Sequence, residues 1–70
     1  MSIENNIRML RARDHLTQSD LADKVNVTRQ TIVALEKGSY VPSLQLAFDL
    51  AKVFQMRVDE LFYEENDEDE

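Results

Sequence analysis

The side chains that most often carry covalent chemistry are scarce in this sequence. It has no cysteine, one histidine at His15, and one glycine, which is too few for a glycine-rich phosphate loop. There is no pair of histidines and no convincing nucleophile beside a general base. A lone histidine in a turn is more typical of a surface residue than of a metal ligand. The sequence therefore predicts that the chain is not an enzyme and uses no cofactor or metal ion.

A different kind of chemistry is available on the segment that follows Thr28. A helix is predicted from Arg29 to about Lys37, with Ile32 and Leu35 on its inner face. Its outer face carries Arg29, Gln30, Val33 and Lys37. Such a face suits non-covalent recognition of a polar surface, although it is also typical of a helix that only contacts water.

Five short helices are expected to position this face. Apolar periodicity predicts helices near residues 3–13, 17–25, 29–37 and 43–55, and a short one at 58–62. Thr17, Thr28 and Ser43 are expected to act as N-caps. Asn26 and Gly38 suit the left-handed conformation that ends a helix. These elements predict a compact all-α domain.

Two of the predicted helices, 17–25 and 28–37, are joined by a tight turn. Ala22 is small where the two helices must approach, and Asn26 tolerates positive φ in the turn. The residues expected to hold the pair against the core are Leu21, Val25, Val27, Ile32 and Leu35. The second helix would then present polar groups near its N-terminus, where it can enter the major groove of DNA.

The net charge of −6 at first argues against nucleic acid, because phosphate contacts need Lys and Arg. Six of the 14 acids lie in the last seven residues, which leaves eight acids and all eight bases in residues 1–63. The net charge of residues 1–63 is therefore zero. We expect a helix-turn-helix domain at 1–63 and a disordered tail at 64–70, because the tail is acidic and has no apolar periodicity. The tail also lacks the ligand spacing of a calcium loop, so it is not expected to bind a cation.

The sequence also bears on location. No apolar run approaches the roughly 20 residues that span a bilayer. The first residues lack the basic start and apolar stretch of a signal peptide, and the absence of cysteine is compatible with a reducing compartment. These features predict a soluble cytoplasmic protein.

Three segments resemble a known family: LTQSDLADKV at 16–25, VTRQTI at 27–32 and LEKG at 35–38. They are similar to the Cro/C1-type (XRE-like) helix-turn-helix family of phage repressors and small regulators, over roughly residues 3–62. The resemblance implies a compact five-helix, lambda-repressor-like fold that binds double-stranded DNA. Asn26 and His15 depart from the family pattern, which often has glycine at these two positions.

The resemblance also implies roles for individual residues on and around the recognition helix, residues 29–37. It implies base contacts from Arg29, Gln30, Val33 and Ala34. Arginine suits the paired acceptors of guanine, glutamine suits adenine, and apolar side chains suit the thymine methyl group. It implies backbone contacts from Gln18, Thr28, Lys37, Ser39, Tyr40 and Arg11.

Simpler explanations remain open for some of these residues. Arg11 resembles the family's arginine that pairs with a glutamate, here Glu36, to tie the first helix to the third. Lys37 is equally explained as a favourable charge at a helix C-terminus. Tyr40 is equally explained as a loop residue that packs on the core.

Two functions are consistent with the sequence. The first is a sequence-specific transcriptional regulator, a repressor, acting as a homodimer on a two-fold operator. Its dimer contact is expected around Val58, Leu61, Phe62 and Tyr63, where a short helix has more apolar residues than it needs. The alternative is an antitoxin-like or adaptor module with the same fold, whose acidic tail binds a protein partner or covers the DNA-binding face.

Overall fold

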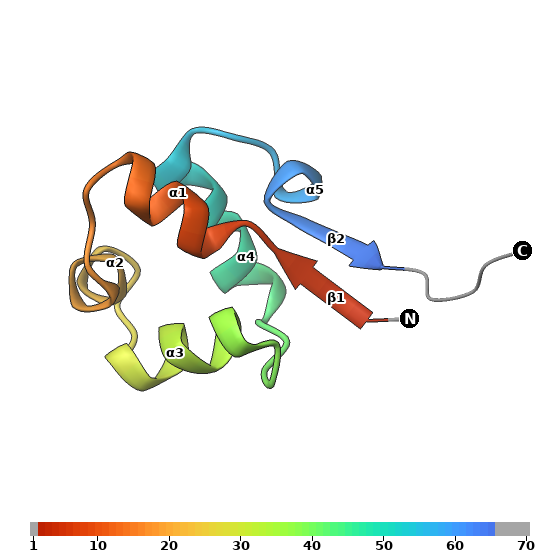
Figure 1. The fold of residues 1–70 in the computed structure, drawn as a ribbon, viewed down its shortest axis with the longest axis horizontal. Coiled ribbons are helices and arrows are strands. Elements are labelled where there is room, and N and C mark those ends of the chain that lie inside the picture. Colours follow the sequence, from red (N-terminus) through yellow and green to blue (C-terminus); the bar gives the residue numbers. More distant parts are fainter. Residues whose placement is uncertain (1, 66–70) are drawn as a thin grey trace, which may run out of the picture.

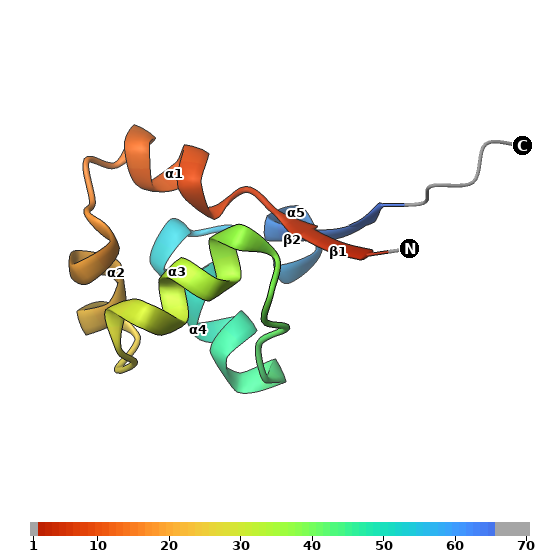
Figure 2. The ribbon, with the colours of Figure 1, turned by 60° about the horizontal axis from the view of Figure 1, so that its bottom comes forward.

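The computed structural model of the chain describes residues 2–65 (Figure 1). It contains five helices and two short strands within that range. In chain order they are β1 Ser2–Asn5, α1 Ile7–Arg13, α2 Gln18–Lys24, α3 Arg29–Lys37, α4 Leu44–Phe54, α5 Val58–Leu61 and β2 Phe62–Glu65. The helices form a compact group, and the two strands extend from one side of it (Figures 1 and 2). The predicted all-α class and its five helices are confirmed, because the described chain is mostly helical, and the two short strands were not predicted.

The core is apolar and every helix contributes to it. Its members are Ile7, Leu10, Leu21, Ala22, Val25, Ile32, Leu35, Leu46, Leu50, Ala51, Phe54 and Leu61. The helical spacing of the apolar residues explains this, because positions three and four apart fall on one face of a helix. No polar or charged residue is buried among residues 2–65, so hydrophobic burial is the main source of stability.

The boundaries around α2 and α3 follow the capping expectations closely. Thr17 Oγ1 accepts a hydrogen bond from the Asp20 amide at 2.9 Å, and the Asp20 carboxylate accepts one from the Thr17 amide at 3.0 Å. These two hydrogen bonds form a capping box, and they hold the pKa of Asp20 below its usual value. Asn26 adopts φ 60° and Gly38 adopts φ 79°, so both residues end their helices in the left-handed conformation.

Thr28 is a partial exception to these expectations. It occupies the N-cap of α3, but its side chain makes no capping hydrogen bond. Its hydroxyl lies 3.3 Å from that of Thr31 instead. His15, where the family that the chain resembles often has glycine, adopts φ 59° in the turn after α1.

The N-terminal segment differs from the prediction. The helix expected from residue 3 begins at Ile7, and residues 2–5 form β1, which pairs with β2 in an antiparallel ladder. Asn5 stops the helix from extending towards the N-terminus, since its Oδ1 accepts the Ile7 amide at 3.0 Å and its Nδ2 donates to the Leu35 carbonyl at 2.9 Å. Local periodicity could not reveal a ladder between the two ends of the chain.

The C-terminal segment differs for the same reason. Phe62, expected in the fifth helix, begins β2, and the ladder continues through Glu64 and Glu65. The boundary predicted after Tyr63 therefore falls inside a strand, and residues 66–70 of the predicted tail lie outside the described residues. In the part of the chain that the structure describes, no helix is both long and apolar enough to cross a bilayer.

Candidate nucleic-acid interface

Helices α2 and α3 form a packed unit around a tight turn. Figure 2 shows α3 across the front of the molecule with α2 beside its N-terminus. The turn is closed by a hydrogen bond of 3.0 Å from the Val27 amide to the Ala22 carbonyl. Ala22 is buried at this approach, and Leu21 and Ile32 are fully buried from the two sides. The core therefore fixes the position of α3 relative to α2.

The outer face of α3 exposes hydrogen-bonding groups at its N-terminal end. Arg29 and Gln30 are both exposed, and neither side chain makes a hydrogen bond or ion pair to another residue of the described range. Val33 and Ala34 follow on the same face and are half-buried, and Lys37 is exposed at the last turn. The N-terminal end of α3 therefore presents hydrogen-bond donors that are unpaired within the described range, and the middle of the helix presents a small apolar surface.

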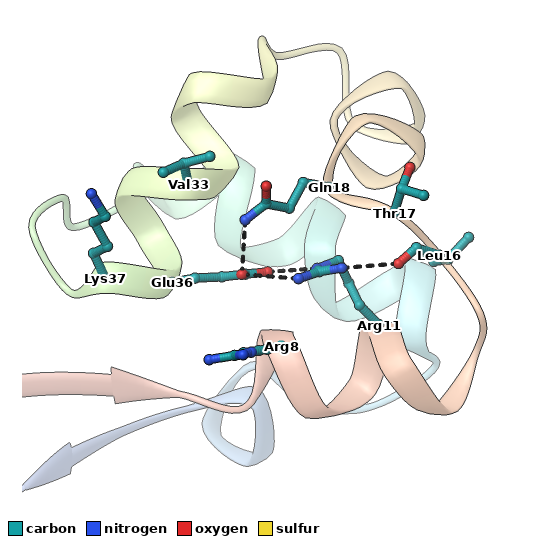
Figure 3. A pocket seen from close by; sticks show the side chains of 8 residues that line it. All are labelled: Arg8, Arg11, Leu16, Thr17, Gln18, Val33, Glu36 and Lys37. Carbon is teal, nitrogen blue, oxygen red and sulfur yellow. Dashed lines mark hydrogen bonds and ion pairs between the residues drawn. The ribbon is translucent and has the colours of Figure 1, made fainter.

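A polar network braces α3 against α1 and α2 (Figure 3). Arg11 forms a two-bond ion pair with Glu36, with Nε 2.6 Å from Oε2 and Nη2 3.0 Å from Oε1. Arg11 Nη1 also donates to the Leu16 carbonyl at 3.0 Å, and Gln18 Nε2 donates to Glu36 Oε1 at 3.1 Å. The side chains of Arg11 and Glu36 are only 16% and 9% exposed. One carboxylate therefore ties three helices together.

The pKa values of the pair follow from this geometry. Burial alone would raise the pKa of Glu36, but hydrogen bonds from Arg11 and Gln18, with the charges of Arg11 and Arg8, bring it below its ordinary value. The hydrogen bond to Glu36 raises the pKa of Arg11 despite partial burial. Both groups are therefore charged at neutral pH.

Apart from Arg11 and Gln18, the predicted backbone contacts lie at the two ends of α3. Thr28 is exposed at the N-terminal end. Beyond the C-terminal end, Ser39 donates to the Ala34 carbonyl at 3.3 Å, and Tyr40 is 43% exposed. Gln18 lies between the two ends and reaches α3 through Glu36. The structure therefore brings Gln18, Arg11 and Glu36 into contact, whereas Ser39 and Tyr40 stand apart from that network.

An open hollow of about 550 Å³ lies between α1, α2 and α3 beside this network. It is lined by Arg8, Arg11, Leu16, Thr17, Gln18, Val33, Glu36 and Lys37 (Figure 3). The sequence-based assignment omitted Arg8. The signal was available, because Arg8 precedes Arg11 by three residues and so shares its face of α1.

Comparison with known proteins gives a consistent result. The helix-turn-helix family model matches residues 7–61. The chain is 50% identical over 66 residues to an uncharacterised helix-turn-helix-type transcriptional regulator from Methanocaldococcus jannaschii, covering 94% of this chain and all of that protein. A regulator of the same description from Bacillus subtilis is 45% identical over 65 residues, covering 93% of this chain and 98% of that protein.

A solved structure matches as well. A crystal structure from Bacteroides fragilis, provisionally described as a DNA-binding protein, superposes with a TM-score of 0.76 at 21% identity. The match covers 87% of this chain and 98% of that one, and at this identity it supports the fold alone. The family model and the relatives carry the assignment: the chain belongs to the Cro/C1-type helix-turn-helix family of transcriptional regulators.

Proposed function

We propose that this protein is a sequence-specific repressor that binds double-stranded DNA by inserting α3 into the major groove. The observation that carries the proposal is the pair of exposed side chains, Arg29 and Gln30, at the N-terminal end of a helix fixed by the core. Their donors are free among the described residues, so they can bond to base edges without first breaking a protein contact.

The chemistry of α3 suggests how the bases are distinguished. Arg29 suits the O6 and N7 acceptors of guanine, and Gln30 suits N6 and N7 of adenine. Val33 and Ala34 offer apolar contact to thymine methyl groups. Around these positions, Gln18, Thr28, Lys37, Ser39 and Tyr40 are proposed to contact the DNA backbone and fix the register of α3.

Replacing Arg29 by alanine tests this function. Binding sites are first selected from random duplex DNA with the wild-type protein. We expect Arg29→Ala to weaken binding to the selected site by about 1–3 kcal/mol and to relax specificity at one base position. Fluorescence anisotropy on the site and its single-base variants measures both effects, and circular dichroism checks the fold.

The matched control for this experiment is Arg57→Ala. It also removes one exposed arginine, but it lies at the N-cap of α5, outside the site, where Arg57 pairs with Asp59. We expect Arg57→Ala to leave base preference unchanged. If Arg29→Ala keeps the wild-type preference at every base, α3 is not the recognition helix.

We further propose that the protein acts as a homodimer, because one such unit contacts only a few base pairs. Leu61, predicted from the sequence to lie in the interface, is fully buried and so supports the fold instead. Val58 and Phe62 are half-buried and line an open apolar hollow of about 360 Å³. Leu44 and Val41, which are 69% and 66% exposed, line the same hollow. The sequence-predicted interface is therefore proposed to extend over this hollow, with Tyr63 at 44% exposure nearby in β2.

A charge placed on this apolar surface should separate the protomers. Leu44→Glu puts the charge in the first turn of α4, where a carboxylate suits the helix dipole and the fold should persist. We expect sedimentation velocity to show dimers for the wild type and monomers for Leu44→Glu, with weaker binding to a two-fold site. Met9→Glu is the control, since Met9 is 62% exposed but does not line the hollow. A wild type that stays monomeric with and without the selected DNA would exclude the dimer.

A further inference from the structure

Arg8 is an exposed cation of α1 that lines the hollow between α1, α2 and α3. Figure 3 shows its side chain beside Glu36 and on the same side of α1 as Arg11. The ion pairs within residues 2–65 involve Arg11, Arg13 and Arg57, so Arg8 forms no direct ion pair in that range, although its charge acts on the nearby Glu36 carboxylate. Its charge is therefore available to a ligand.

Arg11 is in the opposite situation. Three of its five N–H donors are already used by Glu36 and the Leu16 carbonyl, and its side chain is 16% exposed. To bind an external anion strongly, it would have to weaken the ion pair that holds α3. A group that fixes the recognition helix is poorly suited to move towards DNA.

The hollow itself has an excess of positive charge. Its charged lining residues are Arg8, Arg11 and Lys37 against Glu36 alone, which gives a net charge of +2. Residues 1–63 as a whole are neutral, so this excess is local. A local positive potential attracts anions whatever the total charge of the protein.

The hollow also borders the outer face of α3. Val33 and Lys37 belong to both, and Thr17 and Gln18 at the start of α2 complete its edge. In the proposed binding mode, with α3 in the major groove, Gln18 at the start of α2 is expected to face the DNA backbone, and the hollow lies beside Gln18. The hollow is open rather than enclosed, so a phosphate group of a large polymer can approach it.

We propose that Arg8 contacts a backbone phosphate of the bound DNA, while Arg11 holds the helices together through Glu36. This inference rests on the proposed DNA-binding function, and it assigns to Arg8 the phosphate contact from α1 that the family resemblance implied for Arg11. Lys37 flanks the same phosphate position from α3. The contact involves no base edge, so it adds affinity without sequence preference.

The dependence of affinity on salt tests the proposal, because each phosphate contact releases condensed counterions. Affinity falls as salt rises, so the slope of log affinity against log salt concentration is negative. We expect Arg8→Gln to make this slope shallower by about 0.9. The advantage of the wild type over Arg8→Gln should therefore shrink about threefold between about 50 and about 200 mM salt. The loss of affinity caused by Arg8→Gln should be equal for the selected site and for an unrelated duplex of the same length.

Two variants serve as controls. Arg13→Gln removes the same charge from the same helix, but Arg13 is bonded to Asp14 and does not line the hollow. We expect it to keep the wild-type slope. Arg8→Lys keeps the charge and should keep the slope as well. Thermal unfolding of all three variants verifies that the fold is intact.

The outcomes separate the inference from the function on which it rests. If Arg8→Gln has the slope of Arg13→Gln, or if Arg8→Lys loses as much as Arg8→Gln, the contact at Arg8 is excluded while the proposed function stands. If the wild type binds duplexes without base preference, the proposed sequence-specific function is wrong. The salt dependence of Arg8→Gln then still shows whether Arg8 contacts a phosphate. If the wild type binds no duplex at all, both are wrong.

Discussion

Replacing Ile32 by alanine is expected to lower the free energy of unfolding by about 2–5 kcal/mol. Ile32 is fully buried in the core on the inner face of α3, so the lost methyl and methylene groups leave a cavity that the neighbouring helices only partly fill. A domain of this length has a total stability on the order of 4–10 kcal/mol. The substitution therefore removes a large share of this stability, and α3 loses one of its two buried side chains.

Urea denaturation followed by circular dichroism measures this effect. The control is Ile32→Val, which removes a single methylene and is expected to cost about 0.5–1.5 kcal/mol. For a domain of this size, each kcal/mol lowers Tm by about 4–8 °C, so the two variants are readily distinguished. Binding to the selected DNA should fall in proportion to the unfolded fraction. Equal stability of the two variants would contradict the packing of α3 described above.

The second large effect is expected from Glu36→Leu. This substitution leaves the Arg11 guanidinium without its carboxylate at a position where only 16% of the side chain is exposed. Breaking a fully buried pair costs about 3–5 kcal/mol, and the partial exposure reduces the expected loss to about 2–4 kcal/mol. Gln18 loses its acceptor at the same time. Urea denaturation at neutral pH measures the loss.

A double variant separates charge from packing. Replacing both partners, Arg11→Met with Glu36→Leu, should recover most of the stability, because an apolar pair of similar volume can replace a largely buried ion pair at little cost. Asp14→Ala is the exposed counterpart, and it should leave Tm nearly unchanged although it breaks the pair with Arg13. No destabilisation by Glu36→Leu alone would show that the Arg11–Glu36 pair does not hold α3.

The same pair gives the protein a defined dependence on pH. The folded-state pKa of Glu36 lies below its ordinary value of 4.5, so the folded protein favours the charged carboxylate more strongly than the unfolded chain does. The resulting stabilisation is fully present above that ordinary value and is lost as the pH falls through the folded-state pKa. Wild-type stability should therefore fall more steeply below about pH 4.5 than that of Glu36→Leu, which lacks the titrating group.

Much of the fold could be predicted because its signals are local. The spacing of Leu46, Leu50 and Phe54 determines which face of α4 is buried, and the Thr17–Asp20 capping box determines where α2 begins. The turn between α2 and α3 requires a residue at positive φ, and Asn26 was identified for that reason. Each signal spans only a few residues of chain, so periodicity and capping rules detect it.

The candidate site was only partly predictable. The exposed face of Arg29 and Gln30 follows from helix periodicity, and the family resemblance supplied the pairing of Arg11 with Glu36. Helix spacing places Arg8 on the same face of α1 as Arg11, but it does not show whether Arg8 forms an ion pair of its own. That depends on contacts between α1 and distant parts of the chain, such as the contact between Arg11 and Glu36, which are 25 positions apart.

The sequence by itself therefore determined the helices, the turn between α2 and α3, and the outward polar groups of α3. Only the tertiary structure revealed the strand pairing at the two ends of the described chain and the absence of an ion pair at Arg8 within residues 2–65. Both features depend on long-range contacts. One is the ladder between residues 2–5 and 62–65, and the other is the network that forms an ion pair with Arg11 but not with Arg8. Such contacts form only when the core brings distant segments together, and no local pattern in the chain specifies them.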